Sequence, residues 1–156
     1  EEEQSSQNWV ITPHPGEAAR LLKTDVATIQ SDRFQSVKML HEKYQGPVVL
    51  KGAGSIVLGV FFNSIAKDLT HDEMFVCSAG NPGMSTGGMG DVLTGVIAGL
   101  IAQGIFISHA TQLGVLIHAR AADMAAFDKG ERGMMATDLM PYLRKLSNPG
   151  LESVYR

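Results

Sequence analysis

Residues 80–91 combine closely spaced glycines with one carboxylate, a pattern suited to phosphate chemistry. Glycine occupies positions 80, 83, 87, 88 and 90, and Asp91 follows directly. Such a segment can adopt positive φ angles and lets a ligand approach bare backbone. The apolar run that starts at Val92 predicts a helix, whose free first-turn N–H groups and positive dipole end would face the glycines. The pattern therefore predicts an anion site with phosphate as its ligand.

Asp91 itself can be interpreted in two ways. Aspartate is among the best helix N-caps, and a cap needs no ligand. A carboxylate beside an anion site can also orient and deprotonate the hydroxyl that attacks a phosphoryl group. Taken alone, the residue types favour a cap and turn over a catalytic site.

Two further segments place polar side chains after predicted strands. Lys51 follows the apolar run 48–50, which is typical of a strand buried on both faces of a parallel sheet. With the glycine-rich residues 52–55 behind it, the lysine is either a solvated strand terminus or a group that holds a nucleotide. The loop 13–16, which contains His14, follows the short apolar run 9–12. Loops at the carboxyl ends of parallel strands are where open α/β sheets bind ligands.

Helices and a hairpin must hold these segments in place. The helix from residue 92 is apolar on two sides, which predicts deep burial. Ser108 is the predicted cap of the next helix, which carries an apolar stripe that includes Leu113 and Leu116. Residues 59–72 predict either an extended hairpin or an inserted flap. The remaining apolar periodicity predicts helices over residues 17–22, 26–44 and 139–146.

Composition limits the classes of function. The chain has 156 residues, of which 44% are apolar and 19% charged, as in one ordinary globular domain. A net charge of −3 without a basic cluster argues against nucleic-acid binding. The single cysteine fits a reducing compartment, and no segment is typical of a signal peptide or membrane span. We expect a cytoplasmic protein.

Three motifs in order resemble the ADP- or ATP-dependent NAD(P)H-hydrate dehydratases, a branch of the ribokinase-like superfamily. They are TPHPGEA at residues 12–18, VVLKGAGS at 48–55 and NPGMSTGGMGDVLTG at 81–95. The resemblance implies a three-layer α/β/α sandwich with a mostly parallel sheet, whose N-terminal part is absent from this chain. It implies a domain over residues 9–147, between a disordered leader at 1–8 and a frayed tail at 148–156.

The resemblance also implies an activity and its residues. Enzymes of this family return hydrated NADH or NADPH to the working cofactor, through phosphorylation of the ring hydroxyl and loss of phosphate. Asp91 would be the base and would contact the hydrated dinucleotide with His14, while Gly87, Gly88 and Gly90 would form the anion hole. ADP would be held by the following residues: Lys51, Gly52, Ala53, Gly54, Ser55 and Gly90. Mg²⁺ would arrive on the nucleotide, and the implied partners are further copies of the chain and an NAD(P)H-hydrate epimerase domain, fused or associated.

Two alternatives stay open. The Gly-Met-Gly-Asp sequence at residues 88–91 is shared in form by ribokinase-like kinases of small metabolites such as vitamin precursors. The motifs at residues 81–84 and 12–14 favour the dehydratases over these kinases. The other alternative is a nucleotide-binding module without catalysis, because half of the family's domain is missing.

Overall fold

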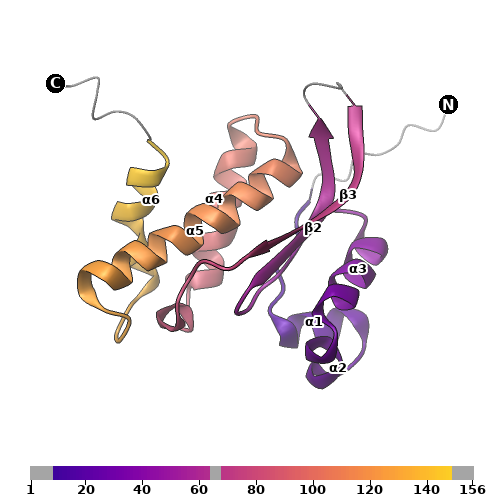
Figure 1. The fold of residues 1–156 in the computed structure, drawn as a ribbon, viewed down its shortest axis with the longest axis horizontal. Helices are drawn as coiled ribbons and strands as arrows, with labels where there is room; N and C mark the ends of the chain where they lie inside the picture. Colours follow the sequence, from indigo (N-terminus) through magenta and orange to yellow (C-terminus); the bar gives the residue numbers. More distant parts are fainter. Residues whose placement is uncertain (1–8, 64–67, 149–156) are drawn as a thin grey trace.

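Two sets of helices cover the two faces of a three-stranded sheet (Figure 1). The computed structural model describes residues 9–63 and 68–148, so the predicted leader and nearly all of the predicted tail lie outside the described residues. The strands are β1 (Val48–Leu50), β2 (Ser55–Asn63) and β3 (Asp68–Cys77), in the spatial order β1-β2-β3. Helices α1 to α3 pack on one face, and α4 and α5 pack on the other.

The direction of these strands differs from the mostly parallel sheet implied by the resemblance. Both strand pairings are antiparallel, and the one parallel pairing among the described residues is an isolated bridge between Ile11 and Val48. The reason lies in the connections. Only four residues separate β1 from β2 and β2 from β3, and a parallel pair needs a crossover connection of a dozen or more residues. The hairpin of β2 and β3 pairs from Ser55 and Cys77 out to Asn63 and Asp68, so the extended-hairpin interpretation of residues 59–72 is confirmed.

The short strand β1 is fully buried, as its apolar sequence predicts. Successive side chains of a strand point to opposite faces of a sheet. Val48 and Leu50 accordingly pack with the helices of one face, whereas Val49 packs with Leu93 and Val115 on the other. Lys51, the next residue, is therefore fixed to a segment that is held from both sides.

The helix predicted over residues 26–44 is two helices in the structure. Asp25 caps α2 through the Thr28 N–H at 2.8 Å, and Asp32 then caps a separate helix through the Gln35 N–H at 2.8 Å. No described helix is both long enough and apolar enough to cross a membrane. The helices are α1 (Pro15–Leu22), α2 (Val26–Ser31), α3 (Arg33–Tyr44), α4 (Met89–Ala102), α5 (Ile107–Lys129) and α6 (Met140–Leu146), with 3₁₀ turns η1 (Pro82–Met84) and η2 (Ala136–Leu139).

The predictions for α5 were wrong in its cap and in part of its stripe. The N-cap is Phe106, and Ser108 lies inside the helix, 1% exposed, because its hydroxyl packs against Gly59 of β2. Leu113 and Leu116 are each 38% exposed. Alanines and Gly114 face the core instead, since small residues allow α4 and α5 to approach closely.

The prediction of deep burial for α4 was also wrong. Only Met89, Leu93 and Ile97 are buried, and the opposite face is open. Nothing lies within 4 Å of the position that a Cβ atom would take at Gly95 or Gly99. The helix is thus held by one face, which packs on α5 and the sheet.

The contact between Gly114 and Ile97 should limit what α5 tolerates. A Cβ atom at Gly114 would lie 2.6 Å from Ile97 Cγ1, so we expect Gly114→Ala to lower the free energy of unfolding by about 1–3 kcal/mol. The matched control is Gly99→Ala on the open face of α4, which should raise it by up to about 1 kcal/mol. Urea unfolding of both variants measures the difference, and equal midpoints would contradict the packing described here.

Candidate active site

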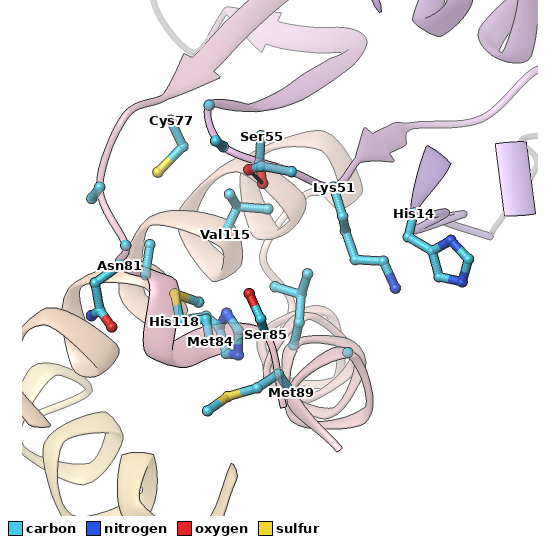
Figure 2. Close-up of a pocket in the computed structure, with 18 of the residues that line it drawn as sticks. His14, Lys51, Ser55, Cys77, Asn81, Met84, Ser85, Met89, Val115 and His118 are labelled. Atoms are coloured by element: carbon cyan, nitrogen blue, oxygen red, sulfur yellow. Dashed lines mark hydrogen bonds between the residues drawn. The ribbon is translucent and has the colours of Figure 1, made fainter. Parts of the chain in front are cut away.

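A cavity of ≈ 810 Å³ opens where the sheet meets the glycine-rich segment and the starts of α1 and α4 (Figure 2). This volume is in the range of small-molecule and cofactor sites. All of the predicted ADP-binding residues 51–55 line the cavity, and so do Gly90 and His14. The walls are completed by apolar side chains, including Cys77, Met84, Met89, Leu93, Val115 and Ala119.

Lys51 reaches from the end of β1 to the start of α4. Its backbone N–H donates to the Pro13 carbonyl at 2.9 Å, and its Nζ lies 3.6 Å from Oε2 of Glu17. A Cβ atom on Gly90 would lie 3.0 Å from the same Nζ. The ammonium therefore lies against the first turn of α4, and glycine at position 90 leaves the room for it.

The N-terminus of α4 is open at this point. The N-cap is Gly88, whose φ of 85° is in the left-handed region that favours glycine, and it has no side chain to cap the helix. Among the described residues, the N–H groups of Met89, Gly90 and Asp91 have no hydrogen-bond partner. Free N–H groups, the positive end of the helix dipole and the Lys51 ammonium thus converge, and an anion is the ligand that satisfies all three.

Asp91 is the third residue of α4 and does not open the helix, so the cap interpretation is excluded. Its side chain is exposed and forms no hydrogen bond or ion pair within the described part of the chain. Asp91 is not among the cavity-lining residues, although Gly90 before it is. Side chains on a helix tilt toward its N-terminus, which directs the carboxylate toward the end that carries the free N–H groups. Gly87 and Gly88 lie in the preceding turn and do not line the cavity.

His14 has a structural role that the sequence analysis missed. Its Nδ1 accepts from the N–H groups of Gly16 at 3.0 Å and Glu17 at 3.2 Å, and Oε2 of Glu17 accepts from the His14 N–H at 2.7 Å. This is a capping box with histidine in the place of serine or threonine, and the spacing His-x-x-Glu was the available signal. Because Nδ1 accepts, the neutral ring carries its proton on Nε2, which lies 3.5 Å from Oε1 of Glu17.

Glu17 links the two predicted site residues His14 and Lys51. Burial alone would raise the pKa of its carboxyl group. The His14 backbone N–H and the Lys51 ammonium outweigh that effect, so the pKa of Glu17 is lowered. Glu17 is therefore ionised near neutral pH and acts as the counterion that holds Lys51 in the absence of another anion.

His118 forms part of the cavity wall from the α5 side (Figure 2). The side chain is 5% exposed, and its Nε2 has no hydrogen-bond partner among the described residues. Burial lowers its pKa to about 4, although the Met89 backbone acts in the opposite direction. The structure thus places a buried, neutral histidine beside the cavity.

Two charged residues outside the cavity hold its loops, and the sequence analysis identified neither. Asp123 of α5 accepts from the Gly80 N–H at 3.1 Å and from Nδ2 of Asn81 at 3.2 Å, which anchors the start of the glycine-rich segment. Arg33 of α3 donates to the Ala53 carbonyl at 2.8 Å and to the Leu50 carbonyl at 3.2 Å. Both contacts join residues far apart in the sequence, so no local pattern could reveal them.

Known proteins resemble this chain over most of its length. A family model described as NAD(P)H-hydrate dehydratase matches residues 1–145. The chain belongs to the NAD(P)H-hydrate dehydratase family. It is 52% identical over 143 residues to a bifunctional NAD(P)H-hydrate repair enzyme Nnr of Coxiella burnetii. The alignment covers 92% of this chain and 27% of that protein. It is 38% identical to an ADP-dependent (S)-NAD(P)H-hydrate dehydratase of Neisseria meningitidis serogroup B, over 91% of this chain and 45% of that protein.

Solved structures confirm the ribokinase-like α/β fold. An ADP/ATP-dependent NAD(P)H-hydrate dehydratase from Bacillus subtilis, co-crystallised with ATP/Mg²⁺, aligns with a TM-score of 0.74 and 26% identity over 88% of this chain and 46% of that one. A ribokinase-like superfamily protein from Enterococcus faecalis aligns with a TM-score of 0.66 and 26% identity, over 87% of this chain and 44% of that one. The chain spans less than half the length of each of these relatives.

The buried histidine of this dehydratase-family chain should make its stability depend on pH. The pKa of His118 is about 4 in the folded chain and 6.5 in a free histidine, so between these values the unfolded chain binds more protons. The neutral His118 ring makes its full contribution to the free energy of unfolding above pH 6.5. That contribution, about 3 kcal/mol, is lost as the pH falls toward 4. Urea unfolding over this range measures the slope. His118→Gln should show a smaller slope, and an unchanged slope would contradict the burial of a neutral ring.

Proposed function

We propose that this chain carries the nucleotide-binding and phosphoryl-transfer part of an ADP-dependent NAD(P)H-hydrate dehydratase, a hydro-lyase of metabolite repair. The observation that carries the proposal is the convergence of Lys51 and the free N–H groups of Met89, Gly90 and Asp91 at one cavity. That convergence favours a phosphoryl group. The named activities of the Neisseria and Bacillus relatives supply the substrates, ADP or ATP and NAD(P)H hydrate.

In the proposed reaction, residues 51–55 and Gly90 hold ADP, and His14 and Asp91 contact the hydrated nicotinamide. Asp91 takes the proton from the ring hydroxyl, whose oxygen attacks the terminal phosphorus while the bond to the leaving AMP breaks. Elimination then breaks the carbon–oxygen bond and removes a ring proton, which yields NAD(P)H and inorganic phosphate. Phosphorylation is needed because hydroxide is a poor leaving group and phosphate a better one. Gly87, Gly88 and Gly90 provide backbone around the transferred group.

Magnesium enters this proposal only as part of the nucleotide. The described residues contain no group of three or more His, Cys, Asp or Glu side chains that could hold a metal ion. Glu17, the carboxylate nearest Lys51, is already paired with its ammonium. Mg²⁺ that accompanies ADP or ATP would therefore be bound by phosphate oxygens and water, and we assign it no separate protein site.

A second candidate is nucleotide binding without turnover. The observation in its favour is that Asp91 does not line the cavity. Mixing the chain with NAD(P)H hydrate, ADP and Mg²⁺ and following the absorbance of NADH separates the candidates. Return of NADH supports the dehydratase, whereas ADP binding without NADH supports the binding module. Homo-oligomer formation and an epimerase partner stay predictions from the resemblance.

Replacing the proposed base should separate binding from turnover. Asp91→Asn removes the proton acceptor but no cavity-lining group, so ADP affinity should stay within about twofold. Turnover should fall by roughly 10²–10⁴-fold, the usual contribution of a general base. Calorimetry and the NADH assay measure the two quantities, and full turnover in the variant would contradict the assignment.

Lys51 and Gly90 should act as one unit in nucleotide binding. Lys51→Ala removes the ammonium, and Gly90→Ala displaces it, because the added Cβ atom would lie 3.0 Å from Nζ. Each variant should weaken ADP binding by about tenfold or more, while Gly90→Ala keeps or raises the stability of the helix. Calorimetry on the two single variants and the double variant tests the coupling. Additive losses would show that the two residues act separately, contrary to this proposal.

A further inference from the structure

Arg33, the first residue of α3, binds the loop at residues 51–54 but does not line the cavity. Its Nη1 donates to the Ala53 carbonyl at 2.8 Å and its Nη2 to the Leu50 carbonyl at 3.2 Å. Arg33 is half-buried and does not line the cavity, whereas residues 51–55 do. The two nitrogens of one guanidinium group thus bind carbonyls before and within the loop.

The loop backbone is shaped around this contact. Gly52 has a φ of 151°, and a Cβ atom there would lie 3.0 Å from Nη2 of Arg33. Gly54 has a φ of 71°, in the left-handed region that side chains disfavour. Both glycines are therefore needed for the loop to lie against the guanidinium in this conformation.

The geometry of the trans peptide bond determines the direction in which the Gly54 N–H points. No cis peptide bond occurs among the described residues, and a trans peptide places its C=O and N–H on opposite sides. The Leu50 carbonyl points to Arg33, and the Lys51 N–H on the other side of that peptide donates to Pro13 at 2.9 Å. By the same geometry, the Ala53 carbonyl points to Arg33 and the Gly54 N–H points away from it. That N–H has no partner among the described residues.

Arg33 also has no acidic partner for its positive charge in the described part of the chain. None of the ion pairs among the described residues includes Arg33, and its buried Nε has no hydrogen-bond partner there. A half-buried cation without a carboxylate is costly unless another negative charge is near. Together with Lys51, it adds positive potential around the loop on which the proposed nucleotide is bound.

We propose that Arg33 is a positioning residue, which fixes the Ala53–Gly54 peptide so that the Gly54 N–H donates to an oxygen of the bound nucleotide. The inference rests on the proposed function for its ligand. To the proposed site the inference adds Arg33, which lies outside the cavity, and the Gly54 N–H as a donor to the ligand. Adenosine and AMP as alternative ligands distinguish a sugar oxygen from a phosphate oxygen.

The test compares Arg33→Met with Arg33→Lys, and with Arg20→Met as the matched control at an exposed arginine of α1. Arg33→Met should weaken ADP binding by about tenfold or more, a change worth about 1.4 kcal/mol. Arg33→Lys, which keeps the charge and one donor direction, should lose less, and Arg20→Met should lose nothing. Calorimetry measures the affinities, and urea unfolding shows whether each variant is folded.

Amide NMR supplies a readout that a merely structural role would not change. The Gly54 amide resonance of the unsubstituted chain should move when ADP is added, and it should move less in folded Arg33→Met. Equal ADP affinity and equal Gly54 shifts in the two proteins would overturn the role of Arg33 while leaving the proposed function intact. Failure of the unsubstituted chain to bind ADP would instead overturn the proposed function, and the inference with it.

Discussion

The structure depends on one electrostatic arrangement: the Lys51 ammonium lies against the free N-terminus of α4. Both carry positive charge, so their proximity is unfavourable unless an anion is bound between them. In the described part of the chain, the Glu17 carboxylate lies 3.6 Å from the Lys51 ammonium, and Asp91 is an acidic residue in the first turn of α4. Glycine at position 90 permits the approach, because a Cβ atom there would lie only 3.0 Å from Lys51 Nζ. A phosphoryl group entering the cavity would replace Glu17 as the partner of Lys51.

The rest of the fold serves to keep these charges in place. The fully buried strand β1 fixes the backbone of Lys51, since Val48 and Leu50 pack on one face of the sheet and Val49 on the other. The two loops of the site are each tied by a charged side chain from a helix outside the cavity, one by Arg33 and the other by Asp123. Such prearranged donors need little reorganisation when a ligand arrives, which is the usual basis of electrostatic catalysis.

The sequence was informative about residue types and local structure, and less so about contacts. Glycine spacing and the buried strand before Lys51 could be predicted, because each depends on neighbouring residues, whereas the caps at His14 and Phe106 were not. The contact of Lys51 with Gly90 could not, since the two residues are distant in the chain. The two-sided apolar pattern of α4 predicted full burial, yet one face is open in a chain that spans less than half of its relatives. The hairpin after Lys51 made the sheet antiparallel where the motif predicted parallel strands.

A crystal structure of the chain with ADP tests the central claim most directly. The account predicts a phosphate of ADP between Lys51 Nζ and the N–H groups of Met89, Gly90 and Asp91, with the ion pair between Lys51 and Glu17 opened. A bound ADP whose phosphates lie elsewhere, with Lys51 still paired to Glu17, would contradict it.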